Sequence, residues 1–247
     1  MKRLVIAALI ALGISFSATP NAQALEGPLS GKTIVIDPGH QLGNGAPEFA
    51  DEINATKFNG AIVKGCNTTG TATNAGFPEA TLNWKIARQL RQLLESQGAT
   101  VVLTRDSNSR SKWGPCVWDR AGIANAAKAD AMVSIHADGG PSGGRGFFVI
   151  EPVRIKGWTD DVIEVDRRLA ADMIAGMKAA GAPPSTYIAG QRMVSREQST
   201  LNFSDVPTVI VEVGNMRNKK DAALMMTSAG QRDYANWLLA GVDRFFK

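Results

Sequence analysis

Short, almost wholly apolar segments alternate along this sequence with segments of helical periodicity, and this alternation constrains the fold more than any other feature. Strands that are apolar on both faces are buried on both faces, which is typical of a parallel sheet covered by helices. We therefore expect an α/β fold, in which a single domain has a mainly parallel twisted sheet flanked by helices on both faces. The predicted strands are 33–36, 100–104, 131–136, 147–150 and 209–212, and the predicted helices are 78–97, 118–127, 160–178 and 229–245.

The helical segments each carry one apolar face at a spacing of three to four residues. The helix that starts at Pro78 and Glu79 is stopped by Gly98. Because only a glycine-rich turn precedes the strand near Phe147, we expect that strand to be a shortened or antiparallel edge strand. The predicted inward residues are Val162, Val165, Leu169, Met173 and Met177 in the third helix, and Tyr234, Leu238, Val242 and Phe245 in the last.

Residues 1–24 have the pattern of a secretory signal peptide. Lys2 and Arg3 precede an apolar run, and Ala22-Gln23-Ala24 forms the cleavage signal. A membrane anchor is the alternative, but the apolar run of about 15 residues is shorter than the ~20 that a span needs. We expect an exported protein, in the periplasm, in the cell wall or secreted, without a membrane anchor after cleavage, and a catalytic domain at 25–247.

Charge and cysteine content narrow the functional class further. The chain has 27 basic and 23 acidic residues, and cleavage removes Lys2 and Arg3, which leaves 25 against 23, or +2. This near balance gives no basis for nucleic-acid binding. In an exported protein the two cysteines, Cys66 and Cys116, predict a disulfide, with two free thiols as the alternative.

The two histidines of the chain follow predicted strands. His40 comes after the first strand and His136 ends the third, while Glu212 ends a later strand and Glu79 opens a helix. Ligands of open α/β sheets bind at the carboxyl ends of strands. Two imidazoles and one carboxylate are the ligands of a catalytic zinc site, and a second carboxylate can serve as a base. The alternatives are ordinary structural histidines and, for Glu79, a favourable charge in a first helical turn.

At these residues the sequence resembles the zinc-dependent N-acetylmuramoyl-L-alanine amidases, often called amidase type 3. The matching motifs stand in family order over about residues 30–247: Ile36-Asp37-Pro38-Gly39-His40, Glu79 before Asn83-x-x-Ile86-Ala87, Arg120-x-x-x-Ala124-Asn125, Ser134-Ile135-His136-Ala137-Asp138, and Pro207-x-x-Ile210-Val211-Glu212-Val213-Gly214-Asn215-x-x-Asn218.

The resemblance implies that His40, Glu79 and His136 bind one Zn²⁺ per chain and that Glu212 is the catalytic carboxylate. It implies hydrolysis of the amide bond between N-acetylmuramic acid and L-alanine in peptidoglycan. The expected partners are peptidoglycan fragments or muropeptides, bound by a monomer. Asp37 and Asp138 are expected to support the ligands or their turns from outside the metal site, although Asp37 is equally explained as a turn former before Pro-Gly.

Several positions depart from the family pattern. Gln41-Leu42 stands where many members have Gly-Gly, Asp138 where many have Asn, and Asn215-Met216-Arg217 where an apolar pair is usual. The long loop 41–77 connects two of the implied ligands and is expected to shape the cleft, with a hairpin near 58–63.

Three rival functions remain. A zinc peptidase or deacetylase acting on peptidoglycan would share the metal, and a non-catalytic cell-wall binding regulator would keep the fold. A serine hydrolase using Ser134 and His136 is the third, but Ser134 does not lie in a G-x-S-x-G turn.

Overall fold

A six-stranded sheet forms the centre of the molecule, in the strand order β4-β1-β5-β8-β6-β7. The computed structural model describes residues 26–247, so the predicted signal peptide lies outside the described residues. The predicted α/β fold with a mainly parallel sheet is confirmed. The sheet strands are β1 (Thr33–Pro38), β4 (Thr100–Leu103), β5 (Ala131–Asp138), β6 (Phe148–Pro152), β7 (Arg192–Ser195) and β8 (Thr208–Asn215).

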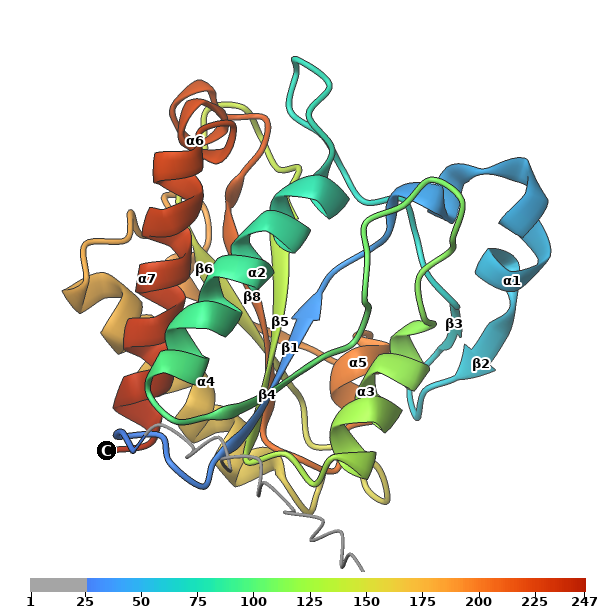
Figure 1. The fold of residues 1–247 in the computed structure, drawn as a ribbon. Helices are drawn as coiled ribbons and strands as arrows, with labels where there is room; N and C mark the ends of the chain where they lie inside the picture. The colour runs from blue at the N-terminus through green and yellow to red at the C-terminus, as the bar shows by residue number, and fades with distance from the viewer. Residues whose placement is uncertain (1–25) are drawn as a thin grey trace, which may run out of the picture.

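Helices cover both faces of this sheet, as Figure 1 shows. The long helices α2, α4 and α7 pack on one face, and the shorter α3 and α5 lie on the other. The helices are α1 (Ala50–Asn54), α2 (Glu79–Ser96), α3 (Val117–Ala126), α4 (Ile163–Ala179), α5 (Ser199–Asn202), α6 (Lys219–Met225) and α7 (Ser228–Phe245). None of the helices in residues 26–247 is both long enough and apolar enough to cross a membrane.

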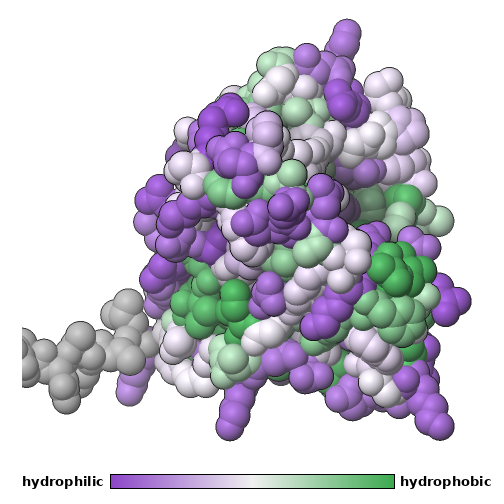
Figure 2. Space-filling view, turned by 90° about the vertical axis from the view of Figure 1, so that its right-hand side faces the viewer, coloured by the Kyte–Doolittle hydropathy of each residue, from purple (hydrophilic) through white to green (hydrophobic). Residues whose placement is uncertain are grey.

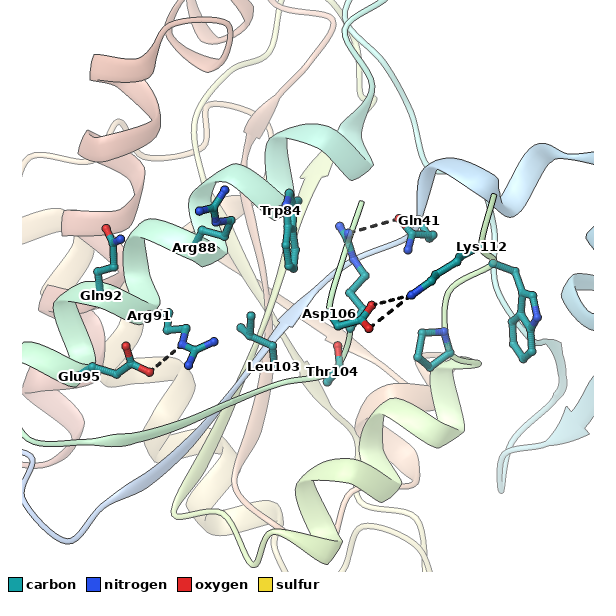
Figure 3. A pocket seen from close by; sticks show the side chains of 13 residues that line it. Gln41, Trp84, Arg88, Arg91, Gln92, Glu95, Leu103, Thr104, Asp106 and Lys112 are labelled. Carbon is teal, nitrogen blue, oxygen red and sulfur yellow. Dashed lines mark hydrogen bonds and ion pairs between the residues drawn. The ribbon is translucent and has the colours of Figure 1, made fainter. Parts of the chain in front are cut away.

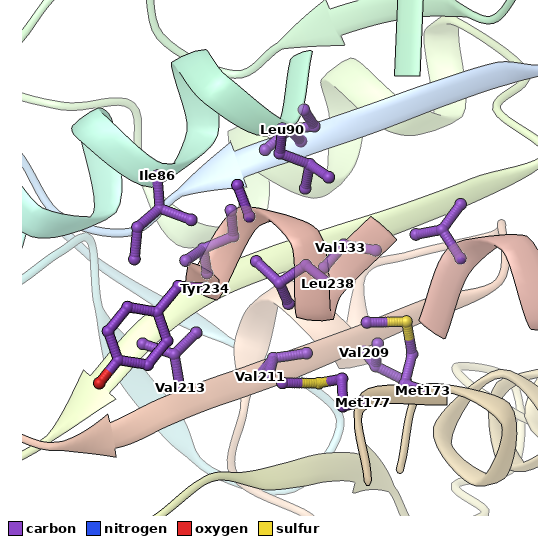
Figure 4. Close-up of a cluster of buried hydrophobic side chains, with 14 of the residues drawn as sticks. Ile86, Leu90, Val133, Met173, Met177, Val209, Val211, Val213, Tyr234 and Leu238 are labelled. Atoms are coloured by element: carbon purple, nitrogen blue, oxygen red, sulfur yellow. The ribbon is translucent and has the colours of Figure 1, made fainter. Parts of the chain in front are cut away.

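The main core lies between the sheet and the three long helices (Figure 4). Alternate residues of β8, Val209, Val211 and Val213, point into this core together with Leu238 of α7. Each such side chain contributes about 1.5–3 kcal/mol when fully buried. Ile210, between two of them, belongs to a smaller hydrophobic cluster on the opposite face. Because side chains alternate along a strand, Glu212 of β8 points to this second face together with Ile210.

Two predictions about individual elements were wrong. The strand β6 is antiparallel to β8 as expected, but it lies between β8 and β7 rather than at the edge. The edge strand is the unpredicted β7, whose sequence Arg-Met-Val-Ser is short and carries a charge, as edge strands often do. In α4, Val165 is 37% exposed, whereas Asp166 is buried. A polar residue that bonds the backbone of a neighbouring strand has therefore taken a core position.

Asp166 accepts a hydrogen bond from the backbone N–H of Thr208. Burial, with further contributions from Asp161 and Glu151, raises the pKa of Asp166 from 3.8 to about 7. The folded protein then holds a proton that the unfolded chain releases near pH 4. The contribution of this proton to the free energy of unfolding is fully present below about pH 4 and is lost as the pH rises through about 7.

We therefore expect the wild-type free energy of unfolding to fall by on the order of 2 kcal/mol between about pH 5 and about pH 8. Asp166→Asn keeps an acceptor for Thr208 and should make the decline smaller by this amount. Urea unfolding at both pH values measures it, with Asp233→Asn at an exposed position of α7 as the control. If the free energy of unfolding of Asp166→Asn fell between these pH values by as much as that of the wild type, the proton would not belong to Asp166.

The segment 41–77 is more ordered than a loop. It contains 3₁₀ turns, α1 and the antiparallel hairpin of β2 (Thr56–Phe58) and β3 (Val63–Gly65), so the predicted hairpin is confirmed. The predicted disulfide between Cys66 and Cys116 is present and joins the segment to the start of α3. Figure 2 shows the face on this side of the molecule, which is mainly hydrophilic with separate hydrophobic patches.

Candidate metal centre and active site

The candidate site lies on the sheet face that α3 and α5 cover incompletely. His136 of β5 and Glu212 of β8 are direct neighbours in the parallel register, so their side chains stand next to each other. Both lie inside their strands rather than at the ends, because β5 and β8 continue to Asp138 and Asn215. The prediction that these residues lie toward the carboxyl ends of the strands was correct, but the predicted ends of the two strands were too early.

His40, Glu79 and His136 form a group whose ligand atoms all lie within 4.8 Å of one another. Glu79 Oε1 is 3.2 Å from His40 Nε2 and 3.1 Å from His136 Nδ1. Four ligands around zinc at about 2.0–2.1 Å are separated by about 3.3 Å when the geometry is tetrahedral. The two separations from Glu79 Oε1 are therefore close to those of a tetrahedral zinc site, and the donor atoms are of the types that zinc binds.

The turn that presents His40 has an unusual backbone. His40 itself has a positive φ of 60°, a conformation that few residues other than glycine adopt. Its Nδ1 lies 2.9 Å from the carbonyl oxygen of Thr68, which suits an N–H donor there and leaves Nε2 directed at Glu79. A carbonyl partner of this kind fixes the tautomer of a metal-binding histidine.

Two glycines allow the backbone to approach the ligands. A Cβ on Gly39 would lie 2.3 Å from the His136 ring, and a Cβ on Gly70 would lie 2.6 Å from Glu79 Oε2. Gly70 also has a positive φ of 74°. No other residue would fit at these two positions without moving a ligand.

The electrostatics of the three residues favour a bound cation. Burial alone would raise the pKa of Glu79, but the charges and hydrogen bonds of His40 and His136 hold it well below its ordinary value. Burial opposes protonation of His40, yet the Glu79 carboxylate and the Thr68 carbonyl raise its pKa. Glu79 is therefore a carboxylate that requires positive charge beside it.

Asp37 lies behind the His40 turn, outside the group formed by His40, Glu79 and His136. Its oxygens accept hydrogen bonds from Thr104, Ser134 and Arg120, at 2.5, 2.6 and 2.5 Å. Burial opposes ionisation, but Arg120 and the two hydroxyls lower the pKa of Asp37 to about 2. Arg120 also donates to the carbonyl of His40. Asp37 thus acts on the His40 turn through Arg120, and Ser134 is a buried donor rather than an exposed nucleophile.

Glu212 faces the same cleft. Its Oε2 is buried and has no hydrogen-bond partner among residues 26–247. Burial, and then the negative charges of Glu79 and Asp138, raise the pKa of Glu212 well above its ordinary value. A carboxylate in such surroundings holds a proton readily, which is the property of a group that transfers one. Asp138 accepts a 2.7 Å hydrogen bond from Tyr187, which the sequence did not single out.

A cleft of about 340 Å³ is lined by His40, Glu79, His136, Asp138 and Glu212. A larger groove of about 990 Å³ lies on the other side of the His40 turn, between α2 and β4 (Figure 3). Arg105 separates the two: its guanidinium packs on the Trp84 ring and donates to the carbonyls of Pro38 and Ala80. Sequence reasoning missed Arg105, although it follows a predicted strand and could have been found by the same strand-end argument.

The sequence matches the family described as N-acetylmuramoyl-L-alanine amidase over residues 34–244. It is 36% identical to N-acetylmuramoyl-L-alanine amidase Rv3717 of Mycobacterium tuberculosis, over 93% of each chain. The crystal structure of the amidase Ami1 from Mycobacterium smegmatis is similar with a TM-score of 0.81, at 33% identity, and covers 88% of this chain and 98% of that one. Ami1 from Mycobacterium abscessus gives 0.82 at 36% identity, over 89% and 100%.

Proposed function

This chain belongs to the N-acetylmuramoyl-L-alanine amidase family, and on that basis we propose that it is a zinc hydrolase that releases stem peptides from peptidoglycan. The observation that carries the proposal is the meeting of His40, Glu79 and His136 in one cleft with Glu212. The bond cut is the amide between N-acetylmuramic acid and L-alanine.

His40 Nε2, Glu79 and His136 Nδ1 are the proposed zinc ligands. Three protein ligands leave a fourth position for water or substrate, as in other catalytic zinc sites. A zinc ion bound there would polarise the scissile carbonyl and lower the pKa of a coordinated water. Arg120, Thr68, Gly39 and Gly70 do not touch the ion in this proposal, but they set the positions of the ligands.

Glu212 is the proposed proton carrier. Its Oε2 takes a proton from the attacking water and delivers it to the amide nitrogen that leaves with L-alanine. His136 and Glu212 are neighbours in the register of β5 and β8. The hydrogen bonds between these adjacent strands therefore keep the proton carrier at a constant separation from this proposed ligand.

The proposal includes export and action as a monomer. Export is supported by the signal-peptide pattern in residues 1–24 and by the disulfide Cys66–Cys116, since disulfides persist in oxidising compartments. A monomer is sufficient for catalysis because every proposed ligand and Glu212 come from one chain.

A defined muramyl peptide incubated with residues 25–247 tests the function. We expect intact N-acetylmuramic acid and a free peptide that begins with L-alanine, identified by mass spectrometry. A zinc chelator should abolish the cleavage and added Zn²⁺ should restore it, because the ligands have no metal-free catalytic role. Cleavage inside the peptide would indicate a zinc peptidase instead, and zinc binding without any cleavage would indicate a regulator.

A further inference from the structure

Two hollows lie next to the cleft, one after the other. Gly70 and Thr71 line both the cleft and the first hollow, which measures about 490 Å³. Arg217 lines the first hollow and also the second, which measures about 480 Å³. The shared lining residues place the first hollow beside the cleft and the second hollow beside the first. We call these two hollows together the cationic groove.

The lining of the cationic groove contains positive charge and no carboxylate. Arg110 and Arg217 line its first part, and Arg145, Lys219 and Lys220 join Arg217 in the second. This concentration does not follow from composition, because the chain without its signal peptide carries a net charge of only +2, from 25 basic and 23 acidic residues. The positive charge is instead concentrated in these two hollows beside the cleft.

Most of this charge is not neutralised by the protein. Arg145 forms an ion pair with the buried Asp221 at 3.1 Å. By contrast, Arg217 donates at 3.2 Å to the neutral amide oxygen of Asn74, and neither Arg217 nor the lysines 219 and 220 has an Asp or Glu oxygen within 4.0 Å in residues 26–247. The contact with Asn74 holds the guanidinium between two loops at the rim of the groove, available to an anion.

We propose that Arg217, followed by Lys219 and Lys220, forms a subsite for a free carboxylate of the stem peptide, an inference that rests on the proposed function. The lactyl carboxyl group of N-acetylmuramic acid is consumed in the scissile amide, and the sugars are N-acetylated. The negative charge of such a substrate therefore resides on its peptide. A guanidinium binds a carboxylate through two parallel hydrogen bonds. Arg217 also stands where the sequence departs from the family's usual apolar pair.

Calorimetric binding of two matched peptides tests the subsite without requiring catalysis. Both begin with L-alanine and D-isoglutamate and end at a third residue; one has free carboxylates and the other has all of them amidated. We expect the wild type to bind the free acid at least about tenfold more tightly, as for one charged hydrogen-bonded contact. Arg217→Gln should reduce this preference to about twofold or less.

Arg88→Gln is the matched control, because Arg88 is an exposed arginine of α2 that lines the separate groove of Figure 3. It should retain the wild-type preference. The subsite is overturned if the wild type does not distinguish the peptides, if it binds neither, or if Arg217→Gln keeps the full preference.

Cleavage of the corresponding muramyl peptides separates this inference from the proposed function. An acid-over-amide preference in kcat/KM that disappears in Arg217→Gln supports both. Cleavage with a preference that Arg217→Gln leaves unchanged overturns the subsite and keeps the amidase. Binding that depends on Arg217, without cleavage of any muramyl peptide, supports the subsite and contradicts the proposed function.

Discussion

Glu212→Gln is expected to lower kcat by about a thousandfold while leaving the fold intact, since positioned proton transfer contributes roughly 10²–10⁴ in rate. Glutamine has almost the same shape but cannot take a proton from water. It also removes a negative charge that lies close to Glu79 and Asp138. The melting temperature should therefore stay the same or rise, and zinc content should not fall. Steady-state kinetics on a muramyl peptide, with metal analysis of the same samples, measure both.

Asp138→Asn is the control for this substitution. Asp138 lines the same cleft and also faces Glu212, and its two oxygens accept hydrogen bonds from the Gly139 N–H and the Tyr187 hydroxyl. In asparagine the oxygen can keep the bond from Gly139, and the amide group can donate to the Tyr187 hydroxyl in place of the second bond. We expect less than about a tenfold loss of kcat, since no proton transfer is assigned to it. If Glu212→Gln retained more than a tenth of the wild-type rate, Glu212 would not be the proton carrier.

Arg120→Met is expected to lower the free energy of unfolding by about 3–5 kcal/mol, because removal of one partner leaves a buried charge uncompensated. The partner is Asp37, which is 1% exposed and whose pKa is lowered to about 2. A depressed carboxyl pKa contributes stability above the unfolded value, near pH 4, and this contribution is lost as the pH falls toward 2. Urea unfolding at neutral pH gives the size of the effect.

The same change should also reduce activity. Arg120 donates to the carbonyls of Pro38 and His40, so its loss releases the turn that presents His40, a proposed zinc ligand. Arg91→Met is the matched control: Arg91 pairs with Glu95 on the exposed side of α2, and such pairs contribute less than about 1 kcal/mol. Equal stability losses in the two variants would contradict the importance assigned to the buried pair.

Most of the fold could be predicted from local patterns. The apolar strands and the periodic helices appear at their predicted places, and Tyr234, Leu238, Val242 and Phe245 are all buried in the core as expected. The failures concern elements whose position depends on partners. The strand β7 is short and polar and is recognisable only once β6 lies beside it. Val165 was assigned to the core by periodicity, but the register of α4 on the sheet buries Asp166 instead.

The candidate site shows the same division. The sequence by itself singled out the candidate residues, because the two histidines and the motifs around Glu79 and Glu212 are visible along the chain. Tertiary structure alone decided how they meet: Glu79 Oε1 lies between two imidazole nitrogens more than 35 positions away along the chain in either direction. The distances between these atoms in space depend on strand register and on close glycine contacts, which sequence patterns do not encode.

The sequence also suggested that Asp37 supports the ligands, but only the packed structure showed that it acts through Arg120. The unpaired charge of Arg217 likewise became visible only after the loop at Asn74 was placed beside it. The physical reason is the range of the forces involved. Hydrophobic periodicity and turn chemistry are local and can be read along a chain, whereas ion pairing, desolvation and metal-ligand distances depend on groups that are remote in sequence and adjacent only after folding.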